Sequence, residues 1–151
     1  MTPLLVDTSV LIKWFHGQGE PELNEALAIR HAVQRGDVEC RVIDLALYEM
    51  GNVLLRSLGW KGSDVADQLD DLVLVCGAPM AMTPEWLRRA ADVGATHGLT
   101  FYDAAWAASA LELGVPLVSS DRLLLASGLA ESPTATTTRL RLRLGPSEPK
   151  E

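Results

Sequence analysis

Residues 99–122, LTFYDAAWAASALELGVPLVSSDR, predict a helix followed by a buried strand. Thr100 is a favourable helix N-cap, and the alanine-rich run after it has high helix propensity until Gly114 ends the helix. The strand Val115–Ser119 is short and apolar throughout, which is typical of a sheet that helices cover on both faces. This stretch therefore indicates half of an α/β unit, and it decides the fold class.

Each of these two elements carries a carboxylate at one end. Asp103 lies in the first helical turn, in the capping-box position three residues after Thr100, and Asp121 follows the strand. Both have a purely structural interpretation, because an acid in the first turn stabilises a helix and Asp121 can cap the helix that starts at Arg122. A functional role depends on which other acids lie nearby.

The N-terminal strand carries a third acid in the same position. Pro3–Val6 form a short apolar run that ends at Asp7, and Thr8 or Ser9 is expected to cap a helix over residues 10–16. Ligands and metals in open α/β sheets bind at the carboxyl ends of the strands. The two acids that follow strands therefore stand where such folds bind ligands.

A fourth acid, Glu49, lies in the long helix predicted for Leu45–Leu58. Glu49, Asn52 and Arg56 follow helical spacing, and with Tyr48 they form a polar stripe on an otherwise apolar helix. One interpretation is a solvent-facing stripe held by weak contacts among these side chains. The other is a place in a functional site, and the helix alone leaves both open.

The rest of the chain continues the α/β pattern. Apolar spacing predicts further helices at 22–35, 63–72, 84–97 and 122–127, and further strands at 38–43, 72–76 and 135–144. We expect Ser63 to cap the second of these helices, whose acids form a solvated face. The last strand alternates threonine and leucine with a basic side formed by Arg139, Arg141 and Arg143.

The composition is that of a globular domain, with 48% hydrophobic and 22% charged residues among 151. We expect residues 1–144 to form one domain and residues 145–151 a disordered tail. The sequence shows no signal peptide and no apolar run of the roughly 20 residues that span a bilayer, which predicts a cytoplasmic protein without membrane contact. Cys40 and Cys76 are interpreted as reduced buried thiols, with a single disulfide as the alternative. The three histidines have no spacing typical of zinc sites.

The net charge of −7 argues against a domain that binds nucleic acid through charge alone. It does not exclude a nuclease. Four carboxylates engaged by a metal would leave −7 + 4 = −3, and local basic patches could still hold a phosphate backbone.

The three aspartates are expected at one edge of the sheet. Parallel strands end at the same edge, and a crossover helix runs back toward it, so the first turn with Asp103 also lies there. Glu49 joins them only if its helix leans over that edge. Two ionised carboxylates 4 Å apart repel by about 4 kcal/mol at an effective dielectric near 20, and a divalent cation removes this cost. Oxygen-only ligands favour Mg²⁺, with Mn²⁺ as a substitute, and such an ion supports phosphodiester hydrolysis.

Four motifs carry these acids: LVDTS at 5–9, YEMGNVL at 48–54, LTFYDA at 99–104 and SSDRLL at 119–124. In order and spacing they resemble the motifs of PIN-domain ribonucleases, most closely the VapC toxins of type II toxin–antitoxin systems. The resemblance covers residues 1 to about 138. It implies a three-layer α/β fold with a central, mostly parallel, twisted sheet of four to five strands flanked by helices.

The resemblance also implies a Mg²⁺-dependent endoribonuclease. Asp7 and Asp103 would be the main metal ligands, Asp121 would complete the acidic site, and Glu49 would orient or help to deprotonate the attacking water. The neighbouring polar side chains would be Thr8, Ser9, Asn52 and Ser120. The family further implies a homodimer, a structured RNA substrate such as tRNA or rRNA, and inhibition by a VapB-like antitoxin. The C-terminal Arg-Leu repeat departs from the usual pattern.

Three alternatives remain open on the sequence. A housekeeping PIN nuclease in RNA processing would use the same acids. A phosphatase with Asp7 as the nucleophile would need a second aspartate two residues later, where this chain has Ser9. A non-catalytic interaction domain would use the acids only as helix caps.

Overall fold

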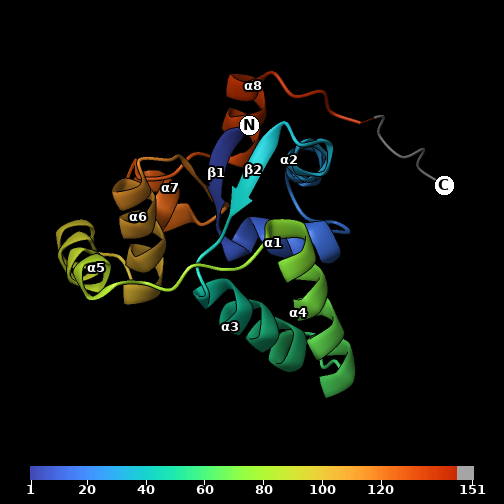
Figure 1. Ribbon diagram of the computed structural model, residues 1–151, viewed down its shortest axis with the longest axis horizontal. Helices are drawn as coiled ribbons and strands as arrows, with labels where there is room; N and C mark the ends of the chain where they lie inside the picture. The colour runs from blue at the N-terminus through green and yellow to red at the C-terminus, as the bar shows by residue number, and fades with distance from the viewer. Residues whose placement is uncertain (146–151) are drawn as a thin grey trace.

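A three-stranded parallel sheet lies at the centre of the computed structural model, which describes residues 1–145 (Figure 1). The strands are β1 (Thr2–Val6), β2 (Val38–Arg41) and β3 (Leu117–Val118), in the order β2-β1-β3. Strand β1 pairs in parallel with both neighbours, and its residues 4–6 are fully buried. The apolar run after Pro3 therefore forms the central strand, as its lack of a polar face predicts.

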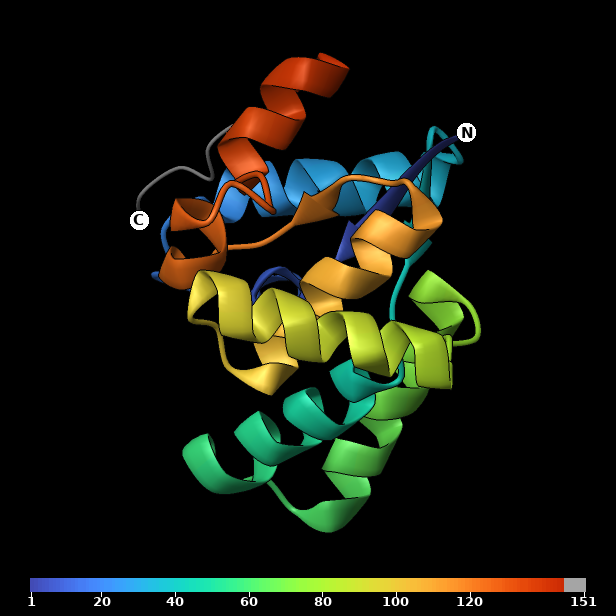
Figure 2. The same cartoon turned by 90° about the vertical axis from the view of Figure 1, so that its left-hand side faces the viewer.

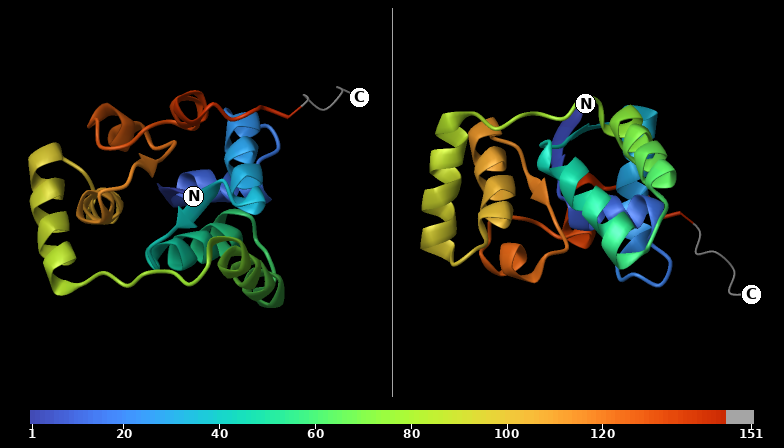
Figure 3. Two further views of the ribbon diagram at one scale, coloured as in Figure 1. Left: turned by 45° about the horizontal axis from the view of Figure 1, so that its top comes forward. Right: turned by 90° about the horizontal axis from the view of Figure 1, so that it is seen from below.

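Helices cover both faces of the sheet. They are α1 (Thr8–Phe15), α2 (Leu23–Arg35), α3 (Leu45–Asn52), α4 (Gly62–Cys76), α5 (Pro84–His97), α6 (Phe101–Leu113), α7 (Arg122–Ala126) and α8 (Pro133–Leu140). Helices α5 and α6 pack together on one side, and α1 and α2 lie on the other with α8 against α2 (Figures 1 and 3). This layered α/β arrangement confirms the predicted fold class.

The sheet has fewer strands than the predicted four to five. Isolated parallel bridges, Ile43 to Met80 and Val118 to Glu131, extend it by single residue pairs on its two edges. Strand β2 ends at Arg41, so the run predicted to reach Ile43 is a shorter strand followed by one of these bridges. One segment thus lies beside each edge strand, where a further strand would lie, but each pairs through a single residue and does not form a strand.

The strand predicted at Leu72–Cys76 is wrong, because these residues form the last turns of α4. Leu72 and Cys76, four residues apart, are both buried, whereas Leu74 between them is 82% exposed. A strand would put all three residues on one face, while a helix puts only the first and last together. The apolar run was too short to separate these two periods.

The strand predicted at 135–144 is also wrong, because α8 occupies Pro133–Leu140. Ser132 caps this helix by accepting a hydrogen bond from the Ala135 N–H, and Pro133 stands at its first position. Thr136 and Thr137 are both buried, which breaks the alternation that a two-faced strand requires. The Ser-Pro start signal outweighs the alternating pattern that follows it.

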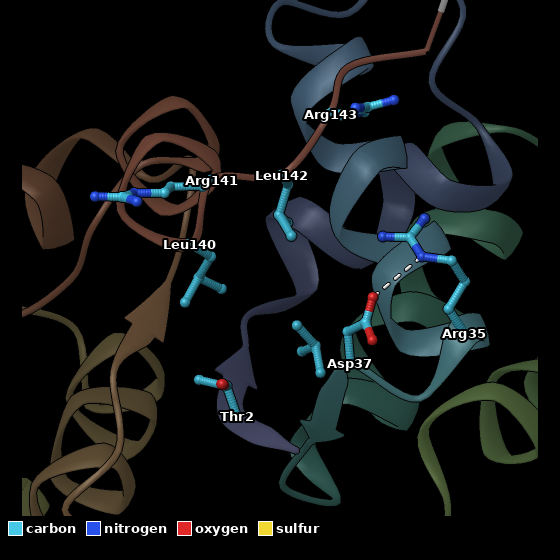
Figure 4. Close-up of a pocket in the computed structure, with 8 residues that line it drawn as sticks. Thr2, Arg35, Asp37, Leu140, Arg141, Leu142 and Arg143 are labelled. Atoms are coloured by element: carbon cyan, nitrogen blue, oxygen red, sulfur yellow. Dashed lines mark hydrogen bonds and ion pairs between the residues drawn. The ribbon is translucent and has the colours of Figure 1, made fainter.

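The expected basic side of that strand does not form. Arg139 pairs with Glu131, and Arg141 ends α8 in the left-handed conformation. Arg141 and Arg143 line a surface pocket of about 560 Å³ together with Arg35, Leu140 and Leu142 (Figure 4). Figure 4 shows Arg35 paired with Asp37, and Arg141 pointing away from that pair.

Several helix ends differ from the predictions. Asp7 occupies the N-cap of α1, ahead of Thr8, and Lys61 occupies that of α4, ahead of Ser63. The helix predicted to reach Leu58 is α3 followed by a π-helical turn, η1 (Val53–Ser57). The boundaries thus shift by a few residues while the elements themselves remain.

The two cysteines are free and buried, as predicted, with their Sγ atoms 3.2 Å apart. Among the residues that the structure describes, no helix combines the length and apolar character needed to cross a bilayer. The tail predicted at 145–151 lies outside the described residues except for Gly145, which is exposed.

Candidate active site

The parallel sheet brings Asp7 and Asp121 to one edge, as the sequence predicts. Val6 pairs with Val118, and the Asp7 N–H donates a hydrogen bond to the Val118 carbonyl at 3.0 Å. Each aspartate therefore follows one of two neighbouring parallel strands at its carboxyl end. The crossover helix α6 begins near the same edge with Asp103 in its first turn.

Asp7 is the most deeply buried of the four predicted acids, at 4% exposed. Its Oδ2 accepts hydrogen bonds from the hydroxyls of Ser119 at 2.6 Å and Ser9 at 2.8 Å. The pKa of Asp7 is raised from 3.8 to about 6 as the net result of several causes: burial raises it most, the two hydroxyl bonds and the Thr8 backbone lower it, and the charge of Glu49 raises it. Within residues 1–145, no lysine, arginine or histidine forms an ion pair with this carboxylate.

Asp103 lies within electrostatic reach of two other acids. Partial burial raises its pKa, and the charges of Asp121 and Asp7 raise it further. The Asp103 N–H donates to the Thr100 hydroxyl at 3.1 Å, which confirms the predicted N-cap of α6. The backbone of Asp103 thus completes the cap, while its carboxylate lies within reach of the charges of Asp121 and Asp7.

Asp121 does cap a helix, as the structural interpretation predicted. Its Oδ1 accepts hydrogen bonds from the N–H groups of Leu123 and Leu124, both at 3.0 Å. Its charge nevertheless reaches Asp103, so the capping role and a place in the acidic group are compatible. The cap fixes the carboxylate at the edge of the sheet.

Glu49 points into the protein rather than along a solvent-facing stripe. Its Oε1 accepts hydrogen bonds from the Thr8 hydroxyl and from the Trp106 indole N–H, both at 2.9 Å. These bonds connect α3 with α1 and α6. The helix that carries Glu49 therefore does lean over the edge where Asp7 lies, whereas Asn52 and Arg56 are exposed.

Sequence reasoning missed two residues at this site, Trp106 and Ser119. Trp106 is fully buried, and its indole N–H needs a partner there, which Glu49 provides. Its position three residues after Asp103, on the same side of the helix, was a usable signal. The Ser119 hydroxyl donates to Asp7, while Ser120, the neighbouring residue implied by the family, donates its backbone N–H to Ser9 Oγ; Ser120 Oγ is buried without a hydrogen-bond partner in residues 1–145.

The four acids lie around one region, but their carboxylates are not at metal-ligand distances from a common point. Over the described part of the chain, no three histidine, cysteine or acidic side chains are close enough together to hold a metal ion as they stand. The donors are nevertheless all oxygen, and Asp7 is a buried carboxylate with one oxygen, Oδ1, outside its two side-chain hydrogen bonds. This chemistry fits a hard cation such as Mg²⁺.

Comparison of the sequence with known families decides its membership. The sequence profile of the PIN domain matches residues 4–126, a range that contains all four acids. The chain belongs to the PIN domain family. A search of curated protein sequences gave no significant match.

Solved structures share this PIN domain fold. PAE2754 from Pyrobaculum aerophilum is 28% identical with a TM-score of 0.66, over 93% of this chain and 90% of that one. FitAcB from Neisseria gonorrhoeae is 14% identical with a TM-score of 0.62, over 87% of this chain and 98% of that one. VapBC2 from Rickettsia felis, bound to a DNA fragment from its promoter, is 10% identical with a TM-score of 0.61, over 87% of this chain and 97% of that one. At such low identity the last two likenesses are likenesses of fold.

Proposed function

We propose that this PIN domain is a Mg²⁺-dependent endoribonuclease and the toxin of a toxin–antitoxin pair. One observation carries the proposal: a buried Asp7 carboxylate, without a cationic partner in residues 1–145, lies within reach of the charge of Glu49 and Asp103. Burial of an ionised carboxylate is unfavourable unless a cation or hydrogen bonds compensate for it. A divalent cation supplies that compensation.

Asp7 and Asp103 are the main ligands in this proposal, and Asp121 completes the site directly or through water. When bound, Mg²⁺ or Mn²⁺ would lower the pKa of a water molecule and stabilise negative charge on the phosphate. Ser9 and Ser119 hold the Asp7 carboxylate in place through its Oδ2. Both hydroxyls bind Oδ2, so neither occupies Oδ1, the oxygen that would face a cation in this proposal.

Glu49 orients the attacking water and helps to remove its proton. Its Oε1 already accepts two hydrogen bonds, from Thr8 and Trp106, which fix the carboxylate. A fixed carboxylate holds a water molecule in one direction, and that orientation is a substantial part of hydrolytic catalysis. The buried indole of Trp106 is thus a positioning group for Glu49.

The proposed partners follow from the same assignment. We place a VapB-like antitoxin against this chain as its inhibitor, and a second copy of the chain as the partner in a homodimer, in the cytoplasm. The structure named VapBC2 has this fold, and its name joins a VapB to a VapC, which supports a VapB-like partner for this chain. A structured RNA such as tRNA or rRNA is the proposed substrate.

We expect the purified protein to cleave RNA only with a divalent cation present. Incubation with total bacterial RNA in Mg²⁺ or Mn²⁺ should give discrete fragments, because the ion neutralises the carboxylates and activates water. A chelator in excess of the metal should abolish the fragments. Equal cleavage with and without the chelator would contradict a metal-dependent site, and no cleavage of any RNA in Mg²⁺ or Mn²⁺ would contradict the nuclease assignment.

A further inference from the structure

Three exposed aromatic side chains lie on the two helices that carry Glu49 and Asp103, within two residues of these acids in the sequence. Tyr48 is 72% exposed, Tyr102 is 62% exposed and Phe101 is 48% exposed. The chain has only two tyrosines, and each directly precedes an acid of the site, Glu49 or Asp103. Single exposed apolar residues need no explanation, but three exposed rings on the two helices that carry these acids do. We call Tyr48, Phe101 and Tyr102 the aromatic rim.

The contacts at the site place the rim on adjoining elements. The Trp106 indole on α6 donates to Glu49 on α3 at 2.9 Å, so the two helices meet at the acids. Tyr102 lies four residues before Trp106 and therefore on the same side of α6, one turn nearer the helix start. Figure 2 shows the start of α6 beside the middle of α3.

The core does not account for the exposure of these rings. Residues 104–110 of α6 are all buried, so the helix packs fully except in its first turn and at its far end. On α3 the buried residues are Ala46, Met50 and Gly51, which leaves Tyr48 on the solvent side. The rim is thus a surface feature, and its rings are available to a ligand.

Stacking supplies the kind of affinity that this chain's charge does not. A net charge of −7 and four clustered acids repel a phosphate backbone, whereas stacking of a base on an aromatic ring is uncharged. Only unpaired bases present a free face to a protein ring. Resting on the proposed nuclease function, we propose that the aromatic rim stacks unpaired RNA bases next to the bond that is cleaved.

The test measures base stacking in a protein that cannot cut the probe. The probes are stem–loop RNAs of varied loop sequence, with 2-aminopurine in the loop or, as a control, in the paired stem. Its fluorescence falls when the base stacks on an aromatic ring. In an Asp7→Asn background, addition of protein should quench the loop probes and not the stem probes.

Loss of the rings should weaken this binding. Tyr48→Ser and Tyr102→Ser should each lower affinity about fivefold or more and reduce the quenching, since a stacked base contributes on the order of 1–3 kcal/mol. The corresponding Tyr→Phe variants keep the ring and should restore both. Leu111→Ala, which removes an exposed apolar side chain at the far end of α6, should match the parent protein.

Unchanged quenching and affinity in the Tyr48→Ser, Tyr102→Ser double variant would overturn the proposal, as would equal quenching of stem and loop probes. A change of oligomeric state in that variant, with quenching unaltered, would overturn it in favour of an interface between copies of the chain. Cleavage by the wild-type protein is measured separately. If the proposed nuclease function is wrong, the wild-type protein will not cleave RNA in this assay. If only the proposal about the aromatic rim is wrong, cleavage will still depend on the metal and on Asp7.

Discussion

Asp7→Asn is expected to lower the rate of RNA cleavage on the order of a thousandfold, the usual scale for removal of a central electrostatic group from an active site. Asparagine keeps the size of the side chain and can still accept the hydroxyl hydrogen bonds of Ser9 and Ser119. It removes the negative charge that holds a cation. The measurement is the single-turnover rate of cleavage of one RNA in Mg²⁺.

The matched control for this variant is Asp70→Asn. Asp70 is exposed on α4 and belongs to a helix face that we assign to solvent, so the change in net charge is the same and no site group is lost. We expect its cleavage rate to equal that of the wild type. If Asp7→Asn folds, as circular dichroism would show, and cleaves at the wild-type rate, Asp7 has no part in the chemistry.

The same substitution should stabilise the metal-free protein at neutral pH. Burial raises the pKa of Asp7 from 3.8 to about 6 in the folded state, so the folded chain holds this proton more tightly than the unfolded chain. Stability from this group is therefore complete below about pH 3 and is lost as the pH rises from the unfolded pKa of 3.8 through about 6. At 1.36 kcal/mol per pKa unit, the loss is about 3 kcal/mol.

Asparagine does not titrate, so the unfolding free energy of the Asp7→Asn variant does not fall in this way as the pH rises. Denaturant unfolding of wild type and Asp7→Asn in chelator, from about pH 3 to about pH 7, should show a difference that grows by about 3 kcal/mol in favour of the variant. Titration of groups outside the acidic site is common to both proteins and cancels in the difference. The charge of Asp7 also raises the pKa of Asp103, so loss of that charge changes the difference in the same direction. If the difference in unfolding free energy between the two proteins stays constant over this pH range, the fold does not raise the pKa of Asp7.

The placement of the strand-end acids could be predicted from the sequence because it depends on topology. Asp7 and Asp121 each follow an apolar run that forms a strand. Because the two strands pair in parallel, their carboxyl ends lie at the same edge of the sheet. The fold class followed from the same two runs. The predictions failed in two short segments. At 72–76 the apolar spacing fits both a helix and a strand, and at 133–140 the helix-cap signal at Ser132 conflicts with an alternating pattern typical of a strand.

The finer structure of the site depends on contacts that no local pattern encodes. Glu49 meets Trp106 from 57 positions away, and only the tertiary fold, which brings Thr8 and Trp106 within hydrogen-bond distance of Glu49, decides that its carboxylate faces inward. Ser119 and Ser120 are adjacent and chemically identical, so the sequence does not distinguish which hydroxyl reaches Asp7. Tertiary packing makes both choices.

The most direct test of a single cation site built from these carboxylates is calorimetric titration of Mn²⁺ into the metal-free protein. We predict that the wild type binds Mn²⁺, that Asp7→Asn and Asp103→Asn each lose most of this affinity, and that Asp70→Asn binds like the wild type. Absence of Mn²⁺ binding by the wild type, or wild-type affinity in Asp7→Asn, would contradict the site.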